Sequence, residues 1–201
     1  SIIGVSIYRD YKSEMHTILY SYPFSKVDYL FAKFLSGITV VTIITLVIGL
    51  GMIVGFRLPG TNEDIVGPIM LMAYLQAYFV YIIPNIFLFG AIVFAVVTFT
   101  RNIAAGFIVV VLLMLIQGIV SNLLSEPENR LISALIDPFG EQAANYYTRY
   151  WTVSEQNEMM LPVKGVILYN RLIWLGIASA IFALVFRFFT FSQNALSFSL
   201  R

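Results

Sequence analysis

Two long runs of apolar residues without a single charge constrain most strongly what this chain can fold into. The first covers residues 34–56, between Lys33 and Arg57, and the second covers residues 102–125, between Arg101 and Glu126. About 20 helical residues, at about 1.5 Å each, cross the roughly 30 Å hydrocarbon core of a bilayer. The chain is 59% hydrophobic and 11% charged, whereas a soluble domain averages about 45–50% and about 25%. These features predict an all-α, polytopic helical membrane protein.

The alternation of apolar and polar segments predicts four complete transmembrane helices. Segment 65–100 carries no charge over 36 residues, and a helix of that length, about 54 Å, is too long for one crossing and too short for two. Because Pro68 and Pro84 interrupt it, we expect an interfacial helix over about 68–83 and then one crossing that ends at Thr100, before a tight turn at Arg101 and Asn102. In chain order, the prediction is the end of a preceding transmembrane helix (1–8), a polar connector (9–33), a transmembrane helix (34–56), a short loop (57–64), an interfacial helix plus a transmembrane helix (65–100), a transmembrane helix (103–124), a long polar loop with short helices (125–163), a transmembrane helix (164–187) and a tail (188–201).

The basic residues bear on orientation through the positive-inside rule. If segment 65–100 crosses once, seven of the 12 Lys and Arg residues lie on the side of the connector, and if it crosses twice, eight do. The positive-inside rule therefore favours two crossings of segment 65–100, whereas the length of the segment favours one. The single crossing is our prediction, with the connector and the tail in the cytoplasm and loops 57–64 and 125–163 outside it.

Several functional classes lack the residues that they need. A net charge of +1, with no cluster of Lys and Arg among aromatics, argues against nucleic-acid binding. The chain has no cysteine and one histidine, His16, which we interpret as an ordinary surface residue of the connector. The HExxH, GxSxG and GxxxxGK[ST] motifs do not occur in the sequence. We therefore expect no catalytic residues, no metal and no cofactor, and any energy input must come from a partner.

The polar residues inside the predicted spans are uncharged, apart from Arg171 and from Lys164 and Arg187 at the two ends of the last span. Thr39, Thr42 and Thr45 share one helix face, and Asn85 and Gln117 lie in later spans. They are expected to form hydrogen bonds between helices, and the alternative is a substrate path. Arg171 is expected to extend its stem toward the lipid headgroups as an anchor.

The connector is the most informative polar segment. It breaks at Pro23, and Ser25 is expected to cap a second helix that begins at Lys26. Because Leu19, Tyr20 and Tyr29 lie among charges of both signs, the segment suits docking of a soluble protein. The alternative is an amphipathic anchor that lies in the lipid surface.

The sequence of this connector resembles a known family. Residues 14–37, EMHTILYSYPFSKVDYLFAKFLSG, are similar to the segment of type-2 ABC-transporter permeases that reads Glu, Leu-x-Ser-x-Pro, Ser-Arg/Lys, Tyr and Gly-Lys-Phe-x-Gly, with Ala32 in place of the glycine. In that family the segment holds the cytoplasmic coupling helix, which contacts the ATPase subunit. The resemblance implies that the ATPase-coupling residues are Glu14, Leu19, Tyr20, Pro23, Ser25, Lys26, Tyr29 and Lys33.

A second set of motifs resembles bacterial permeases of the same family, some of which are fused to a metallopeptidase domain. The motifs are DPFG at Asp137, YYTRYWTVSEQN at Tyr146, LP at Leu161 and LYNRLIWLG at Leu168. The resemblance implies a six-span fold from which this chain lacks the first span and most of the second. It also implies an extracytoplasmic loop site, whose candidate residues are Asp137, Tyr147, Arg149, Trp151, Asn170 and Arg171.

The sequence and the resemblance together predict the membrane subunit of an ABC exporter in the bacterial inner membrane. The resemblance implies a cytoplasmic ATP-binding subunit as one partner and a second permease, in a homodimer or heterodimer, as another. Two alternatives remain: a secondary transporter or channel, and a non-transporting membrane anchor for an enzyme domain. A substrate path lined by Thr39, Thr42, Thr45, Asn85 and Gln117 suits lipids, drugs, peptides and polysaccharides alike.

Overall fold

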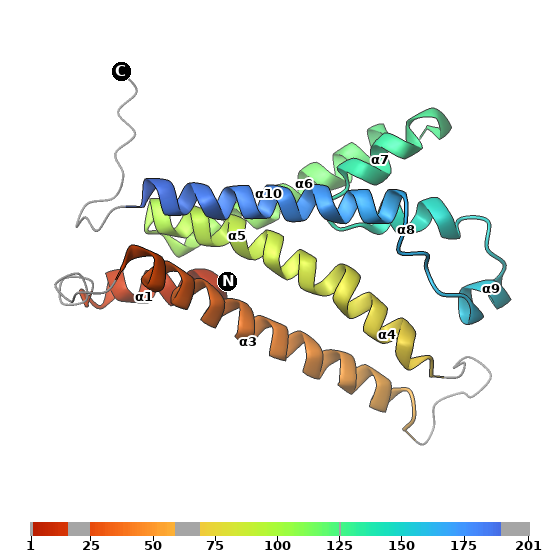
Figure 1. Ribbon diagram of the computed structural model, residues 1–201, viewed down its shortest axis with the longest axis horizontal. Helices are drawn as coiled ribbons and strands as arrows, with labels where there is room; N and C mark the ends of the chain where they lie inside the picture. The colour runs from red at the N-terminus through yellow and green to blue at the C-terminus, as the bar shows by residue number, and fades with distance from the viewer. Residues whose placement is uncertain (1, 16–24, 59–68, 125, 190–201) are drawn as a thin grey trace. The chain divides into compact units, whose positions relative to one another are not determined.

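Helices make up the structure of this chain. The computed structural model describes residues 2–15, 25–58, 69–124 and 126–189, and these ranges contain helices and no strand (Figure 1). Within these ranges, four helical segments are long and apolar enough to cross a membrane, namely Lys26–Gly55, Leu71–Thr100, Ile103–Leu123 and Val166–Phe188. The predicted class, an all-α polytopic membrane protein, is therefore confirmed.

The labels of the helices follow Figure 1. In chain order, the helices are α1 (Ile2–Lys12), α3 (Lys26–Gly55), α4 (Leu71–Ala77), a π-helix (Tyr78–Ile82), α5 (Ile83–Thr100), α6 (Ile103–Leu123), a 3-10 turn (Pro127–Asn129), α7 (Arg130–Ile136), α8 (Glu141–Thr148), α9 (Val153–Glu158) and α10 (Val166–Phe188).

Helix α3 begins where the sequence predicts. The backbone N–H of Asp28 donates to Ser25 Oγ over 3.1 Å, which confirms Ser25 as the cap of a helix that starts at Lys26. The helix then continues to Gly55 without interruption over 30 residues, or about 45 Å. The end of the connector and the following span are therefore one continuous helix.

The helical run Leu71–Thr100 is also continuous, although Pro84 lies inside it. Pro84 has no N–H and its ring crowds the preceding turn, so a regular α-helix would kink there. The backbone instead forms a π-helix just before Pro84, in which the N–H of Ile83 donates to the carbonyl of Tyr78, five residues earlier. Pro84 thus changes the helical winding and does not end the helix as the sequence alone predicts. Pro68 lies outside the described residues.

The structure divides into two units, and the four long helices contribute residues to both. Unit 1 contains Ser1–Val41, Ile86–Ile116 and Leu175–Arg201, and unit 2 contains Thr42–Asn85 and Gln117–Trp174.

Unit 1 has an aromatic core made by α3, α5 and α10. The ring of Phe34 stacks on that of Phe182, with centroids 4.2 Å apart, and meets that of Phe94 edge-on at 5.2 Å. These three side chains are at most 8% exposed. Helices α5 and α6 are joined by the predicted turn at Arg101 and Asn102, where Asn102 Oδ1 accepts from the N–H of Ala104 over 2.9 Å. Pairs of large aromatic residues therefore fix the packing of this unit.

Helices α1 and α3 form an antiparallel pair in unit 1. Ile3 lies against Gly37, where an added Cβ would come within 2.8 Å of the Ile3 Cα. Further along, Ser6 Oγ donates to the carbonyl of Lys33 over 2.9 Å. Because glycine has no side chain, the two backbones can approach this closely.

In unit 2, short helices pack around the first turns of α10. Ala134 of α7, Ala143 of α8 and Ile167 of α10 are fully buried together, with Tyr147 and Leu161 packed against them. The small side chains let the short helices approach α10 closely. The predicted loop 125–163 does contain short helices, and its location outside the cytoplasm stays a prediction.

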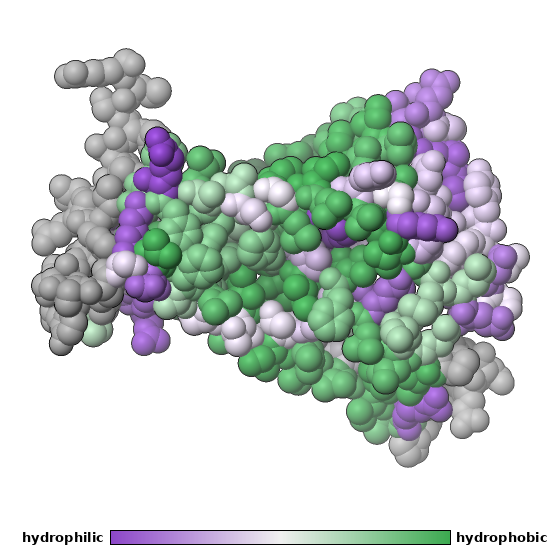
Figure 2. Space-filling view, viewed as in Figure 1, coloured by the Kyte–Doolittle hydropathy of each residue, from purple (hydrophilic) through white to green (hydrophobic). Residues whose placement is uncertain are grey.

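Large apolar side chains cover the outer surfaces of the long helices, as Figure 2 shows. On α3, Ile43 and Val47 are more than half exposed, and so are Phe107 and Ile119 on α6. Apolar faces of this extent are costly in water. They are suited to contact with lipid, because the helices satisfy their own backbone hydrogen bonds.

Candidate functional site

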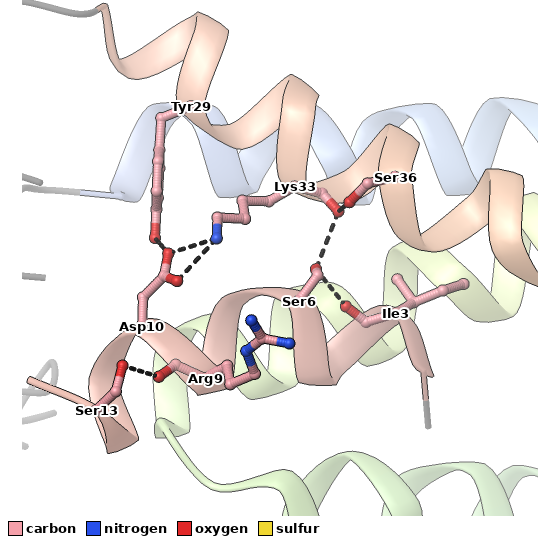
Figure 3. A network of polar contacts seen from close by, with 8 residues as sticks. All are labelled: Ile3, Ser6, Arg9, Asp10, Ser13, Tyr29, Lys33 and Ser36. Carbon is pink, nitrogen blue, oxygen red and sulfur yellow. Dashed lines mark hydrogen bonds and ion pairs between the residues drawn. The ribbon is translucent and has the colours of Figure 1, made fainter. Parts of the chain in front are cut away.

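Asp10 links the two ends of the connector in unit 1. It lies near the end of α1, and its carboxylate forms an ion pair with Lys33 Nζ of α3 at 2.7 Å. The Tyr29 hydroxyl donates to Asp10 Oδ2 over 2.9 Å. In Figure 3 the side chains of Tyr29 and Lys33 both extend from α3 to the carboxylate of Asp10. Tyr29 and Lys33 are four residues apart, so they share one face of α3.

This network separates the predicted coupling residues into two groups. Tyr29 is 6% exposed and the Lys33 side chain is 27% exposed, so both are used in contacts between helices. Glu14 is exposed and Lys26 is half-buried. Ser25 caps α3. Leu19, Tyr20 and Pro23 lie outside the described residues, as does His16.

The DPFG motif of unit 2 forms a turn around the carboxylate of Asp137. Oδ1 accepts from the N–H of Phe139 and from Gln117 Nε2, each over 2.8 Å, and Oδ2 accepts from the N–H of Gln142 over 2.7 Å. The side chain is 1% exposed. Asp137 therefore fixes the turn between α7 and α8 and ties it to α6.

Asn170 of α10 completes the end of α7. Its Nδ2 donates to the carbonyls of Ala134 over 2.7 Å, Asp137 over 2.8 Å and Leu135 over 3.3 Å. One turn later, Trp174 Nε1 donates to the carbonyl of Leu135 over 3.2 Å. The last carbonyls of a helix have no hydrogen-bond partner within the helix. The amide of Asn170 and the indole of Trp174 therefore supply the donors for the last carbonyls of α7. Asn170 is fully buried.

Arg171 is buried beside Asn170, and the headgroup anchor expected from the sequence is wrong. Its Nε donates to Asn170 Oδ1 over 2.8 Å and its Nη1 to Asn85 Oδ1 over 3.0 Å. The guanidinium lies over the ring of Tyr81, 5.4 Å from the centroid. The side chain is 5% exposed, because polar groups on α5 and in the DPFG turn solvate its charge within the protein.

Gly140, the last residue of DPFG, permits this arrangement. Its φ is +83°, in the left-handed region that glycine adopts without strain. An added Cβ would also collide with the guanidinium of Arg171. The structure thus brings the DPFG motif and the Asn170-Arg171 pair of LYNRLIWLG into one buried cluster, which we call the DPFG–NR cluster: Asn85, Gln117, Asp137, Gly140, Asn170 and Arg171.

The polar residues proposed as a substrate path make contacts with neighbouring protein groups. Asn85 and Gln117 belong to the DPFG–NR cluster. The expected hydrogen bond between helices is confirmed for Asn85, which accepts from Arg171 of α10, whereas Gln117 donates to Asp137 of the DPFG turn. The carbonyl of Thr42 accepts from the Tyr78 hydroxyl over 2.6 Å. Thr39 and Thr45 donate to carbonyls of their own helix, and Thr45 Oγ1 also lies 3.5 Å from the Tyr78 hydroxyl. The path itself stays a prediction.

Two other predicted loop residues, Tyr147 and Arg149, make contacts of their own in unit 2. The Tyr147 hydroxyl accepts from the N–H of Val166 and donates to the carbonyl of Lys164, each over 3.2 Å, and so holds the start of α10. Arg149 lies over the ring of Tyr150, 4.6 Å from its centroid.

Trp151 lines a cavity of about 680 Å³ together with Gln76, Tyr81 and Glu141. Its volume lies within the range for small-molecule sites. Glu141 is the one charged side chain in its lining, so its electrostatics disfavour an anion.

Sequence reasoning missed two residues. Asp10 was one acidic residue among several in the connector, and only the shared face of Tyr29 and Lys33 could have pointed to it. Tyr81 carried no signal, yet its hydroxyl is the buried side-chain polar atom that has no hydrogen-bond partner among the described residues. Within the same part of the chain, no group of His, Cys, Asp and Glu could hold a metal ion.

The fold and these clusters define a helical polytopic membrane protein, with a polar network at the base of its connector and a second, buried cluster. A family model described as ABC-2 family transporter protein matches residues 1–138, and the chain belongs to this family. It is a membrane permease component of an ABC transporter, and the family implies an ATP-binding subunit as partner. No curated protein and no solved structure matches the chain.

Proposed function

We propose that this chain is the permease of an ABC exporter in the bacterial inner membrane, where it forms a dimer that two ATP-binding subunits drive through the connector. The observation that carries the proposal is the Asp10–Tyr29–Lys33 network. It joins the helices at the two ends of the segment that resembles a coupling helix, so a force on that segment acts on α1 and α3 together.

Charge-assisted hydrogen bonds in the network support the transmission of a displacement between the two helices. Hydrogen bonds to charged groups contribute about 1.5–3 kcal/mol each, and Asp10 accepts from both Tyr29 and Lys33. The close approach of Ile3 and Gly37 adds a second contact between the helices. Since α3 is uninterrupted from Lys26 to Gly55, movement at its first turn displaces the whole helix.

The two groups of connector residues have different roles in this proposal. Glu14 and Lys26, with Leu19, Tyr20 and Pro23, contact the ATP-binding subunit. Tyr29 and Lys33, with Asp10, pass the displacement into the membrane helices. Docking and transmission are therefore separable by mutation.

The test uses the complex of this permease with its ATP-binding subunit in liposomes. Asp10→Asn should leave co-purification intact and lower ATP-driven transport about tenfold, because about 1.4 kcal/mol of coupling is lost. The double variant Asp10→Lys with Lys33→Asp should recover part of the transport. Ser36→Ala is the matched control, because its hydroxyl bonds to its own helix beside the network.

A docking variant, Glu14→Lys with Lys26→Glu, should instead reduce co-purification. Full transport by Asp10→Asn would refute the role of the network. Transport driven by an ion gradient without ATP would identify a secondary transporter instead. No transport by the wild-type complex, with ATP hydrolysis intact, would favour the membrane anchor.

A further inference from the structure

Both basic residues of segment 126–162 line the same cavity. The segment contains six acidic residues and two basic ones, Arg130 on α7 and Arg149 just after α8. The two arginines line a cavity of about 310 Å³, and none of the six acidic residues lines it. A cavity with a positive lining in an otherwise acidic segment calls for a specific explanation.

The rest of the lining consists mainly of groups that bind phosphate oxygens. Ser121 of α6 and Ser133 of α7 supply hydroxyls, and Gln142 and Asn145 of α8 supply amides. Neither arginine forms an ion pair within the described part of the chain. A guanidinium presents five N–H donors in a planar fork that matches the oxygens of a phosphate.

The position of the cavity along α6 favours a lipid over a soluble anion. Helix α6 has 21 residues and ends at Leu123, so its length of about 31 Å matches the hydrocarbon core. The lining residues Ser121 and Leu124 thus lie where the headgroups begin. Nearby, Leu123 is 72% exposed, and Leu131 and Ile132 on α7 are each 49% exposed, which suits contact with acyl chains.

We propose that this cavity, which is lined by residues of α7, α8 and the end of α6, binds the phosphate headgroup of an anionic lipid through Arg130 and Arg149. Its volume is near the lower end of the range for ligand sites, about 300–1,000 Å³, and fits a headgroup with the acyl chains outside. Glu128 lines an adjoining cavity together with both arginines, and its charge opposes the lipid.

The experiment is native mass spectrometry of the full chain, purified in detergent with equal amounts of phosphatidylglycerol and phosphatidylcholine. The wild type should retain phosphatidylglycerol preferentially. Arg130→Gln and Arg149→Gln should each lower this retention about tenfold, as expected for one lost charge-assisted contact. Lys164→Gln, which removes a basic residue outside the cavity, should leave it unchanged, and Glu128→Gln should raise it.

Further variants separate the explanations. Replacement of both arginines by lysine keeps the positive charges but removes the planar guanidinium donors. This double lysine variant should retain more phosphatidylglycerol than the double glutamine variant. Equal loss in Lys164→Gln and in the arginine variants would overturn the proposal, because nonspecific charge would then explain binding. Displacement of the lipid by millimolar inorganic phosphate would reassign the cavity to a soluble anion. None of these outcomes depends on ATP coupling.

Discussion

Replacement of Asn170 tests whether hydrogen bonding holds the DPFG–NR cluster together. Asn170→Ala removes the donor to the carbonyls of Ala134 and Asp137 and the acceptor for Arg171 Nε. The site is fully buried, so water does not replace the lost donor. A buried polar group left without a partner costs about 1–3 kcal/mol. Two stranded carbonyls therefore give a loss of about 3 kcal/mol in the free energy of unfolding.

The assay is thermal unfolding of the purified chain in detergent, followed by helical circular dichroism. For a chain of this size, about 1 kcal/mol shifts the Tm by roughly 2–4 °C, so Asn170→Ala should lower it by about 6–12 °C. Asn157→Ala is the matched control, because this asparagine is exposed on α9. It should change the Tm by less than about 2 °C.

A second variant separates hydrogen bonding from packing. Asn170→Leu keeps the branching and the number of side-chain heavy atoms and removes the amide, so it should destabilise the protein at least as much as Asn170→Ala does. If Asn170→Leu unfolds at the wild-type temperature while Asn170→Ala does not, lost volume explains the effect. The hydrogen-bonding argument would then be refuted.

Two further predictions concern packing and pH. Gly37→Ala should lower the free energy of unfolding by about 1–3 kcal/mol, because the new Cβ would lie 2.8 Å from the Ile3 Cα. Gly49→Ala is the control, because its new Cβ would meet no described atom within 4 Å, and it should be neutral in the same thermal assay. Equal Tm values for the two variants would contradict the close approach. The backbone N–H of Thr152 donates to the Glu155 carboxylate and holds the pKa of Glu155 below its ordinary value. The stabilisation of α9 by this cap should be complete above the pKa of a glutamate in the unfolded chain, about 4.3. It should be lost as the pH falls through the lower pKa that Glu155 has in the folded protein. NMR titration of the Glu155 carboxyl checks this, and a midpoint at or above the ordinary value would sink it.

Local sequence signals predicted the helices and several of their ends. The long charge-free runs identified the membrane helices, because the hydrocarbon core imposes a minimum apolar length. Ser25 as the cap of α3 and the turn at Arg101 were also predicted correctly, since both depend on residues that are adjacent in the chain. Pro84 was misjudged, because the π-helix before it accommodates the ring without ending the helix.

Only the tertiary structure decided which polar groups meet. It paired Asp10 with Tyr29 and Lys33, and it buried Arg171, which the sequence placed among the lipid headgroups. It also joined the DPFG turn to Asn170, more than 30 residues later, and brought Arg130 and Arg149 into one cavity. These contacts depend on how neighbouring helices cross and rotate, and that geometry follows from the packing of whole helices. The presence and approximate positions of the four membrane helices therefore followed from the sequence alone, whereas the fold decided their full lengths and the polar sites.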